Sequence, residues 1–366
     1  DGYVPTNKLD RNTFNLKVNS DLTPKLQFEG MVNYVNQKVE NRPRLSDAND
    51  NPAYLFISMP RNISLETLKQ YTWTADEIKN QLGFSSSSLY AGLEKTYATN
   101  SSTANPYWTI NKQHNEDQRD RIIGYFKLSY TIAPWLKVIG KTGTDYFVDE
   151  RLFWRAEGTY SSTNKNGDIQ DYVTKTRETN SDILFTSNFK LNDKIDVSLN
   201  LGGNRQKFSS RKVGNSGTEF IVPDLHVINN VKTLNYVFGL SESAINSVYG
   251  SGQVGYNNYL FVDFSGRNDW SSTLPIKNCS FFYPSLGVSY IVSDALKLQN
   301  NFLSFLKIRA SVAQAGSSGD PYSLLGTYSL DSYKHNGVAL GAYTNTVVDP
   351  NLKNELTTSY EGGFDL

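Results

Sequence analysis

The chain has 366 residues, and its 36 basic side chains balance its 36 acidic ones, so the formal net charge at pH 7 is zero. This balance argues against a general nucleic-acid or anionic-membrane-surface partner, because such partners attract an excess of positive charge. The single cysteine, Cys279, excludes an intrachain disulfide framework, and three scattered histidines argue against a His-rich metal site. At about 150 residues per domain, the length alone predicts two or three domains.

The composition favours strands over helices. Aromatic residues make up 13% of the chain, which also contains 37 Asn and 26 Gly. Asn and Gly are poor residues in helix interiors, whereas Tyr and Phe favour pleated sheets. The mean hydropathy is −0.47 and the longest unbroken apolar run is 53–57, far short of the roughly 20 apolar residues of a transmembrane helix. The low hydropathy does not exclude a membrane β-barrel, because only half of the residues of each barrel strand are apolar.

Alternation of apolar and polar residues is the dominant pattern in the chain. In its clearest example Ile195, Val197 and Leu199 alternate with polar side chains, so one face of that segment is wholly apolar. The pattern recurs at 126–130 and 260–264. Read in this way, the chain predicts about eleven strands, near residues 11–21, 25–39, 117–131, 135–156, 168–191, 194–212, 243–256, 259–268, 281–292, 303–314 and 355–366.

The connections between these strands predict how the strands are arranged. Short connections are expected at 21–24, 132–134, 192–193, 257–258 and 293–301. Longer ones are expected at 40–116, 157–167, 213–242, 269–280 and 315–354. Because short and long connections alternate, an up-and-down meander fits, with every tight turn at one end, as in transmembrane β-barrels. A soluble Greek-key sandwich gives no reason for such sorting. The predicted fold class is therefore all-β, a transmembrane antiparallel up-and-down β-barrel.

Aromatic residues gather where the predicted strands end. Tyr and Trp rings are favoured at the headgroup level of a bilayer, because an apolar body and a polar tip are both satisfied there. Ordinary packing at strand ends is the alternative explanation. The residues concerned are Tyr130, Trp135, Tyr256, Tyr259, Phe302 and Phe305 beside short connections, and Phe153, Trp154, Trp270, Phe281, Phe282 and Tyr283 beside long ones.

The segment 40–116 is too long to be a plain loop, and it carries helix signals. Thr74 and Glu77 have the spacing of a capping box, which predicts a helix that ends at Gly83. A shorter helix is predicted over Ser64–Leu68, with the serine as its cap. We expect this long loop to fold as a small ordered cap with short helices.

Motifs that could carry catalysis are weak. Residues 250–255 match GxGxxG, but they lie inside a predicted strand, whereas the dinucleotide fingerprint needs a strand before it and a helix after it. Residues 316–319 are one residue too short for a GxSxG elbow. The acid pairs at 116–117 and 149–150 fall near strand ends, where charge is normally solvated. We expect no catalytic residues and no enzyme.

Metal signals are equally weak. Residues 47–51 begin like a calcium loop, but Pro52 replaces the required Gly and Ser58 stands where a bidentate Glu belongs. A solvated turn is the simpler interpretation, although calcium bound by other loop carboxylates stays open. The three histidines, His114, His226 and His335, lie in separate predicted loops, which argues against zinc. No cofactor or metal site is predicted.

Four groups of short motifs stand in order along the chain from about residue 105. They are Asn105-Pro106-Tyr107-Trp108 with Arg119-Asp120-Arg121, Gly124 and 143–147; 265–272 with Tyr283-Pro284-Ser285 and Val292-Ser293-Asp294; 306–311 with Gly316 and Pro321-Tyr322; and 350–355 with Tyr360-Glu361-Gly362. Together these groups resemble the SusC/RagA-type branch of TonB-dependent outer-membrane transporters. One departure is Asp269-Trp270, where the family usually has Gly after the Asp.

The resemblance implies a barrel of about 22 strands, plugged by an N-terminal domain. Residues 1–366 would then be part of one barrel domain, with the plug, the TonB box and the last strands outside this sequence. It also implies the outer membrane of a Gram-negative bacterium, a SusD-like surface lipoprotein over the extracellular mouth, and energy from the TonB–ExbB–ExbD system. The implied substrates are oligosaccharides from glycans, or peptides.

Four aromatic residues in or near the long connections are predicted to contact a ligand or line the mouth: Tyr107, Trp108, Trp270 and Tyr322. Aromatic faces stack on sugar rings, but packing within the loops or against the lipoprotein explains these residues equally well. A surface adhesin or soluble β-sheet lectin is the first alternative, and it predicts a fragment that is soluble without detergent. An outer-membrane enzyme is the second, and it needs a clustered nucleophile and base.

Overall fold

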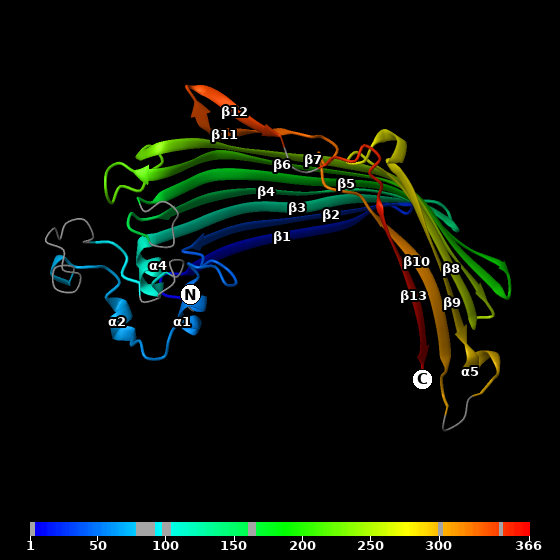
Figure 1. Ribbon diagram of the computed structural model, residues 1–366. Helices are drawn as coiled ribbons and strands as arrows, with labels where there is room; N and C mark the ends of the chain where they lie inside the picture. The colour runs from blue at the N-terminus through cyan, green and yellow to red at the C-terminus, as the bar shows by residue number, and fades with distance from the viewer. Residues whose placement is uncertain (1–3, 78–91, 97–103, 160–165, 299–302, 344–346) are drawn as a thin grey trace.

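One antiparallel sheet dominates the computed structural model, which describes residues 4–77, 92–96, 104–159, 166–298, 303–343 and 347–366. Its eleven strands follow one another in chain order, so the predicted meander is confirmed. Figure 1 shows them as one continuous, strongly curved sheet. They are β1 (Lys8–Thr23), β2 (Leu26–Glu40), β3 (Gln113–Ala133), β4 (Leu136–Arg155), β5 (Asp168–Asn192), β6 (Ile195–Phe220), β7 (Val231–Tyr256), β8 (Leu260–Ser271), β9 (Ser280–Ile291), β10 (Lys307–Ser317) and β13 (Glu355–Asp365).

The sheet does not close on itself. Within the described part of the chain, β1 pairs only with β2, and β13 pairs only with β10. An open sheet of eleven strands agrees with the predicted share of a larger barrel.

The prediction of a long loop over 213–242 was wrong. Strand β6 continues to Phe220 and β7 begins at Val231, which leaves a connection of only 221–230. The part of β6 beyond residue 212, toward the long-connection end, contains mostly polar residues and glycines, so the alternation of apolar and polar residues was not visible there. Such extensions can be polar on both faces where a strand projects beyond an apolar layer into water.

The connection after β10 contains a two-stranded hairpin that was not predicted, β11 (Tyr328–His335) and β12 (Val338–Tyr343). Its turn is Asn336-Gly337, with φ of 49° and 80°. Positive φ at both central residues is what a type I′ turn requires, and Asn-Gly is its most common sequence. The local signal was therefore present in the sequence.

Four of the predicted tight turns are confirmed as connections of two or three residues, at 24–25, 134–135, 193–194 and 257–259. The fifth is wrong, because the connection 292–306 is longer than some of those at the opposite end and contains the short helix α5 (Val292–Ala295). The strict sorting by length therefore fails at β9–β10.

In the described part of the β2–β3 connection lie three short helices: α1 (Pro52–Ser58), α2 (Leu65–Lys69) and α4 (Pro106–Lys112). Figure 1 places them together at one end of the sheet. Ser64 caps α2 as predicted, and its hydroxyl accepts a hydrogen bond from the Thr67 amide. The Thr74–Glu77 capping box is also confirmed, since each side chain accepts from the other's amide. Residues 75–77 are helical, and the rest of the predicted helix lies outside the described residues. None of the described helices has the length and hydropathy needed to cross a membrane.

The strand register sorts the side chains onto two faces. Leu16 pairs with Val32 and Phe185 with Leu201, so these apolar residues share one face, together with Phe126. We call it the apolar convex face. Its large side chains are exposed on the surface of this sheet: Phe126 is 54% and Leu201 is 60% exposed.

The opposite face, which we call the polar concave face, carries charged side chains such as Asp182 and Lys137. Its curvature follows from contacts that skip a strand. The hydroxyl of Tyr249 on β7 donates to Asp182 on β5 at 2.7 Å, across β6. The ammonium of Lys137 on β4 donates to Gln27 on β2, across β3. Side chains from next-nearest strands converge in this way on the inner side of a curved sheet.

Candidate functional site

The long β2–β3 connection is held in shape by a buried asparagine. Asn105 is 1% exposed and caps α4, because its side-chain oxygen accepts from the Tyr107 amide. Its amide nitrogen donates to the carbonyls of Leu68 and Lys95, at 3.1 and 3.0 Å. One side chain therefore ties α4 to α2 and to the segment 92–96. We call the described parts of 41–112 the rim cap.

Trp108 is the apolar centre of the rim cap and is fully buried. Its indole Nε1 donates to the hydroxyl of Thr159 at 2.9 Å, which joins the cap to the β4–β5 connection. The ring also meets Tyr71 edge-on. The N–H of a buried tryptophan usually has a hydrogen-bond partner, and Thr159 is that partner here.

An ion pair closes the far side of the cap. The ammonium of Lys95 donates to Glu77 at 2.6 Å, and Glu77 also accepts from the amide and hydroxyl of Thr74. These interactions, Lys95 first, lower the pKa of the Glu77 carboxyl from its ordinary value. These hydrogen bonds therefore favour the charged form of Glu77.

A second contact joins neighbouring connections at the same end of the sheet. The His226 ring stacks on Trp154, with centroids 3.9 Å apart, and His114 stacks on the same indole. The imidazole Nε2 of His226 also lies 3.1 Å from a carboxylate oxygen of Glu157. These contacts attach the β6–β7 connection to the end of β4 that leads into the β4–β5 connection.

Charged side chains form ordered pairs on the polar concave face. Arg119 and Asp149 form a two-pronged pair, and so do Arg121 and Asp145. Both guanidinium groups lie near the ring of Phe147, 4.8 and 5.7 Å from its centroid. The planar guanidinium matches a carboxylate with two parallel hydrogen bonds, which fixes the direction of these side chains.

A second polar cluster crosses β7 to β9. Arg267 donates to Asp269 and to the Ser247 hydroxyl, each at 2.7 Å. The hydroxyl of Tyr283 donates to the other oxygen of Asp269, and the Arg267 guanidinium lies 5.5 Å from the ring centroid of Tyr249. The concave face is therefore a hydrophilic surface of oriented donors and acceptors, able to contact a polar solute without covalent chemistry.

The four aromatic residues predicted to meet a ligand lie at the long-connection end but do not form one site. Tyr107 is partly exposed in α4 and meets Phe56 edge-on, whereas Trp108 is buried and offers no ring face. Tyr322 is 47% exposed in the connection after β10. Trp270 is 40% exposed but lies on the apolar convex face, in register with Asn246 and opposite in direction to Asp269.

The predicted belt of aromatics at this end is only partly on the convex face. Phe153 and Phe281 are buried, Trp154 stacks between histidines, and Tyr283 points into the concave face. Of these residues only Trp270 and Phe282 stand exposed on the convex face. At the opposite end, Phe302, which was predicted beside a short connection, lies outside the described residues.

The structure places the GxGxxG-like and calcium-like motifs in ordinary secondary structure. Residues 250–255 lie inside β7, and Asn51 of the calcium-like segment caps α1. The interpretation of 47–51 as a solvated turn was wrong for Asp50, which is buried beside Arg44. No group of three or more His, Cys, Asp or Glu able to hold a metal ion occurs among the residues that the structure describes.

The family follows from comparison with known proteins. A family model described as "TonB dependent receptor-like, beta-barrel" matches residues 70–366, most of the chain. The chain belongs to this family. Its members are receptors rather than enzymes, so the expectation of no catalytic centre agrees with the family.

A curated relative and two solved structures extend this result. The TonB-dependent receptor P26 of Formosa agariphila is 25% identical over 276 residues, which cover 70% of this chain and 27% of that protein. The RagAB peptide transporter matches 98% of this chain and 38% of its own, with a TM-score of 0.74 at 16% identity. The ferric-catecholate import receptor Fiu of E. coli K12 matches 99% of this chain and 49% of its own, with a TM-score of 0.54 at 11% identity.

Because these two solved structures are only 16% and 11% identical to the chain, the matches show its fold alone. The TonB-dependent receptor chain described here has the curved meander of their β-barrels. It spans about a quarter of the curated relative and less than half of each solved chain. The resemblance to the SusC/RagA type agrees with the RagAB fold.

Proposed function

We propose that the protein containing this chain imports oligomeric nutrients across the outer membrane of a Gram-negative bacterium, driven by TonB. The observation that carries the proposal is the division of one family-matched sheet into an apolar convex face and a charged concave face. A barrel with this arrangement meets hydrocarbon outside and water inside. Residues 1–366 supply about half of its wall.

The proposed substrates are oligosaccharides from glycans, or peptides. The fold match to a structure described as a peptide transporter supports peptides, and the exposed aromatic residues of the long connections suit sugar rings. The proposed partners are a SusD-like surface lipoprotein at the long-connection end and TonB–ExbB–ExbD, acting through a plug outside this sequence.

Among the four predicted ligand residues, Tyr107 and Tyr322 are the better candidates, because each has exposed ring surface at the long-connection end. Trp270 on the apolar convex face suits the bilayer interface instead. Trp108 holds the rim cap together.

Deletion of the full-length gene tests the proposal. We expect growth on one oligosaccharide or peptide to be lost while growth on its monomer is kept, because monomers pass through porins. Complementation with Tyr322→Ala should slow uptake of that oligomer, and Trp270→Ala serves as the matched control on the outer face. Normal growth of the deletion strain on every oligomer, under conditions where the gene is expressed, would refute import.

The alternative of a non-transporting surface adhesin predicts that this domain stays soluble and monomeric without detergent. The exposed apolar convex face predicts the opposite, partition into micelles and aggregation once detergent is removed. Sedimentation of the purified protein with and without detergent separates the two.

A further inference from the structure

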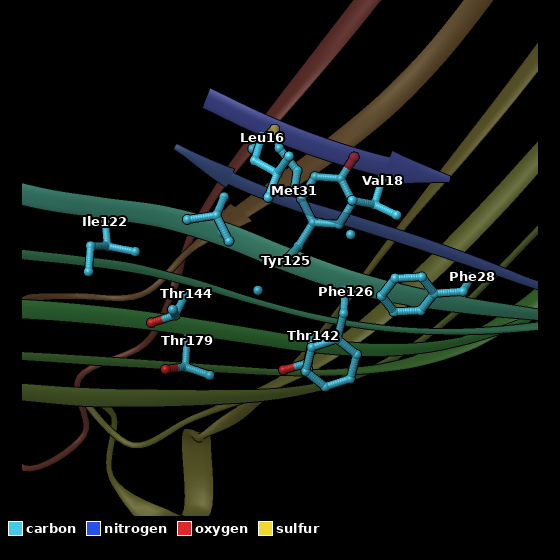
Figure 2. A pocket seen from close by; sticks show the side chains of 14 residues that line it. Leu16, Val18, Phe28, Met31, Ile122, Tyr125, Phe126, Thr142, Thr144 and Thr179 are labelled. Atoms are coloured by element: carbon cyan, nitrogen blue, oxygen red, sulfur yellow. The ribbon is translucent and has the colours of Figure 1, made fainter. Parts of the chain in front are cut away.

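A groove of about 540 Å³ lies on the apolar convex face over β1 to β5. Figure 2 shows Thr142, Thr144 and Thr179 together on one side of it, with Leu16 and Val18 on the other. The remaining lining is almost entirely apolar: Phe28, Gly30, Met31, Val32, Ile122, Gly124, Tyr125, Phe126 and Gly143.

The groove exists because small residues lie side by side in the register. Gly124 pairs with Val32 on one side and with Thr144 on the other, and Thr144 pairs with Thr179. The threonine hydroxyls are already engaged. Thr144 donates to the Glu178 carbonyl at 3.1 Å, and a hydrogen bond of 2.8 Å joins the hydroxyls of Thr142 and Ser181. An apolar chain can therefore lie in the groove without leaving these hydroxyls unsatisfied.

The groove lies at the depth of the bilayer hydrocarbon. A tilted transmembrane strand crosses the hydrocarbon in about 9–11 residues. Counted from the short-turn ends of their strands, Thr144 is eight residues above Leu136 and Gly124 nine above Ala133. Both residues therefore fall within the span. Because the long connections of such barrels face outward, the groove opens toward the outer leaflet.

Three exposed cations stand next to the groove on the same face, Arg205 at the upper limit of this span and the other two above it. Lys207 pairs directly with Thr179 and lies twelve residues above Ile195, the first residue of β6. Arg205 pairs with Ser181, and Arg177 is two residues from Thr179 on β5. We call Arg177, Arg205 and Lys207 the basic triad.

The triad has no acidic partner within the described residues. Arg177 does stack over Tyr146, 5.2 Å from its ring centroid, and this places both on the convex face. Other charged side chains lie farther up the same face. Asp120 is two residues from the groove residue Ile122 and accepts from Tyr34 and Asn36. Further examples beyond the triad are Lys175, Arg211, Glu150, Asp171 and Glu242.

We propose that the groove and the basic triad together bind a phosphorylated, multi-acyl lipid of the outer leaflet. An acyl chain would lie in the groove, and the phosphate would meet the three cations at its upper end. Charge complementarity selects the headgroup, because cations without acidic partners at headgroup depth attract anionic lipid. The groove is continuous with the bilayer-facing surface, so its occupant comes from the membrane. The proposal depends on the barrel spanning the membrane, not on import or its substrate.

The test uses the full-length receptor in dodecyl maltoside micelles, to which diphosphorylated lipid A is added. Native mass spectrometry counts the retained lipid, and the midpoint of thermal stabilisation gives the apparent affinity. Parallel arms use lipid A stripped of phosphate and dioleoylphosphatidylglycerol. We expect wild-type protein to retain lipid A and to bind both other lipids at least tenfold more weakly.

Two sets of variants probe the two halves of the site. Combined Arg177→Gln, Arg205→Gln and Lys207→Gln should weaken lipid A binding about a hundredfold, since each cation contributes about fivefold. Thr142→Leu with Thr144→Leu fills the groove and should weaken binding at least tenfold, because each methylene kept out of apolar contact costs about fourfold.

Matched controls are available elsewhere on the chain. Lys25→Gln removes a positive charge from the opposite end of the sheet, and Ser187→Leu adds a leucine to the convex face of β5 outside the groove. Both should bind like wild type.

Four results would overturn the proposal: no lipid retained by wild type, equal binding of lipid A without phosphate, equal binding of phosphatidylglycerol, or undiminished binding by the triad variant. The triad side chains are exposed, so that variant should fold even where the groove-filled one does not. Failed binding with normal uptake would reject this proposal alone.

Discussion

The contact between Tyr249 and Gly202 gives a sharp prediction about the concave face. The Tyr249 ring reaches from β7 across β6 to Asp182, and it passes over Gly202. A Cβ at position 202 would lie 2.4 Å from the Cζ of Tyr249 and 2.6 Å from its hydroxyl oxygen. Gly202→Ala must therefore displace the ring, because no side chain tolerates contacts this short.

The expected loss follows from what the ring holds. A hydrogen bond to a charged acceptor contributes about 1.5–3 kcal/mol, and the cation–π contact with Arg267 about 0.5–1 kcal/mol at a partly exposed site. Because the pair is only partly buried, we expect Gly202→Ala to lower the free energy of unfolding by about 2–3 kcal/mol.

The assay is urea unfolding of the full-length receptor in lipid vesicles, followed by tryptophan fluorescence. Gly203→Ala is the matched control, because a Cβ there meets only Ser247 O at 3.7 Å and an Ile183 methyl at 3.9 Å. It should cost less than about 1 kcal/mol.

A double-mutant cycle decides whether the clash is the cause. In a Tyr249→Ala background the ring is absent, so the added cost of Gly202→Ala should fall below about 0.5 kcal/mol. If Gly202→Ala is as destabilising there as in wild type, the reasoning from the ring is wrong.

Two further predictions concern the rim cap. Trp108→Ala should destabilise the cap locally by about 3–5 kcal/mol, because it removes the buried indole. Trp108→Phe should destabilise the cap by about 1 kcal/mol, because it removes the hydrogen bond to Thr159. Both variants should show faster amide hydrogen exchange over the cap, and unchanged exchange would contradict the packing role of Trp108. Because the pKa of Glu77 is lowered, its contribution is complete above the ordinary glutamate pKa of about 4.3 and is lost as pH falls through the lower folded value. Exchange protection near Thr74, corrected for intrinsic rates, should therefore fall on strong acidification in wild type but not in Glu77→Gln; equal behaviour of the two would exclude the Lys95 pair as the cause.

Most of the strand pattern was predictable because each strand is half apolar. Alternation such as Ile195, Val197, Leu199 needs no knowledge of neighbouring strands, since the pleat alone separates the two faces. Prediction failed where this contrast disappears. The upper part of β6 was missed for that reason, and the β11–β12 hairpin was missed although Asn336-Gly337 marks its turn.

The candidate site was less predictable. Trp108 and Trp270 look alike in the sequence, as aromatic residues near long connections. The structure buries the first at the centre of the rim cap and turns the second outward onto the convex face. The residues that organise the cap, Asn105 and Thr159, carry no sequence signal beyond a capping asparagine and an ordinary loop threonine.

The sequence by itself determined the all-β class, the order of the strands and the family, because period-two alternation and short motifs are local properties. The tertiary structure decided which side chains meet. Tyr249 reaches Asp182 only because the sheet curves and Gly202 leaves space between them. The groove beside the basic triad likewise depends on the register that aligns Gly124, Thr144 and Thr179, and register is set by pairing between strands.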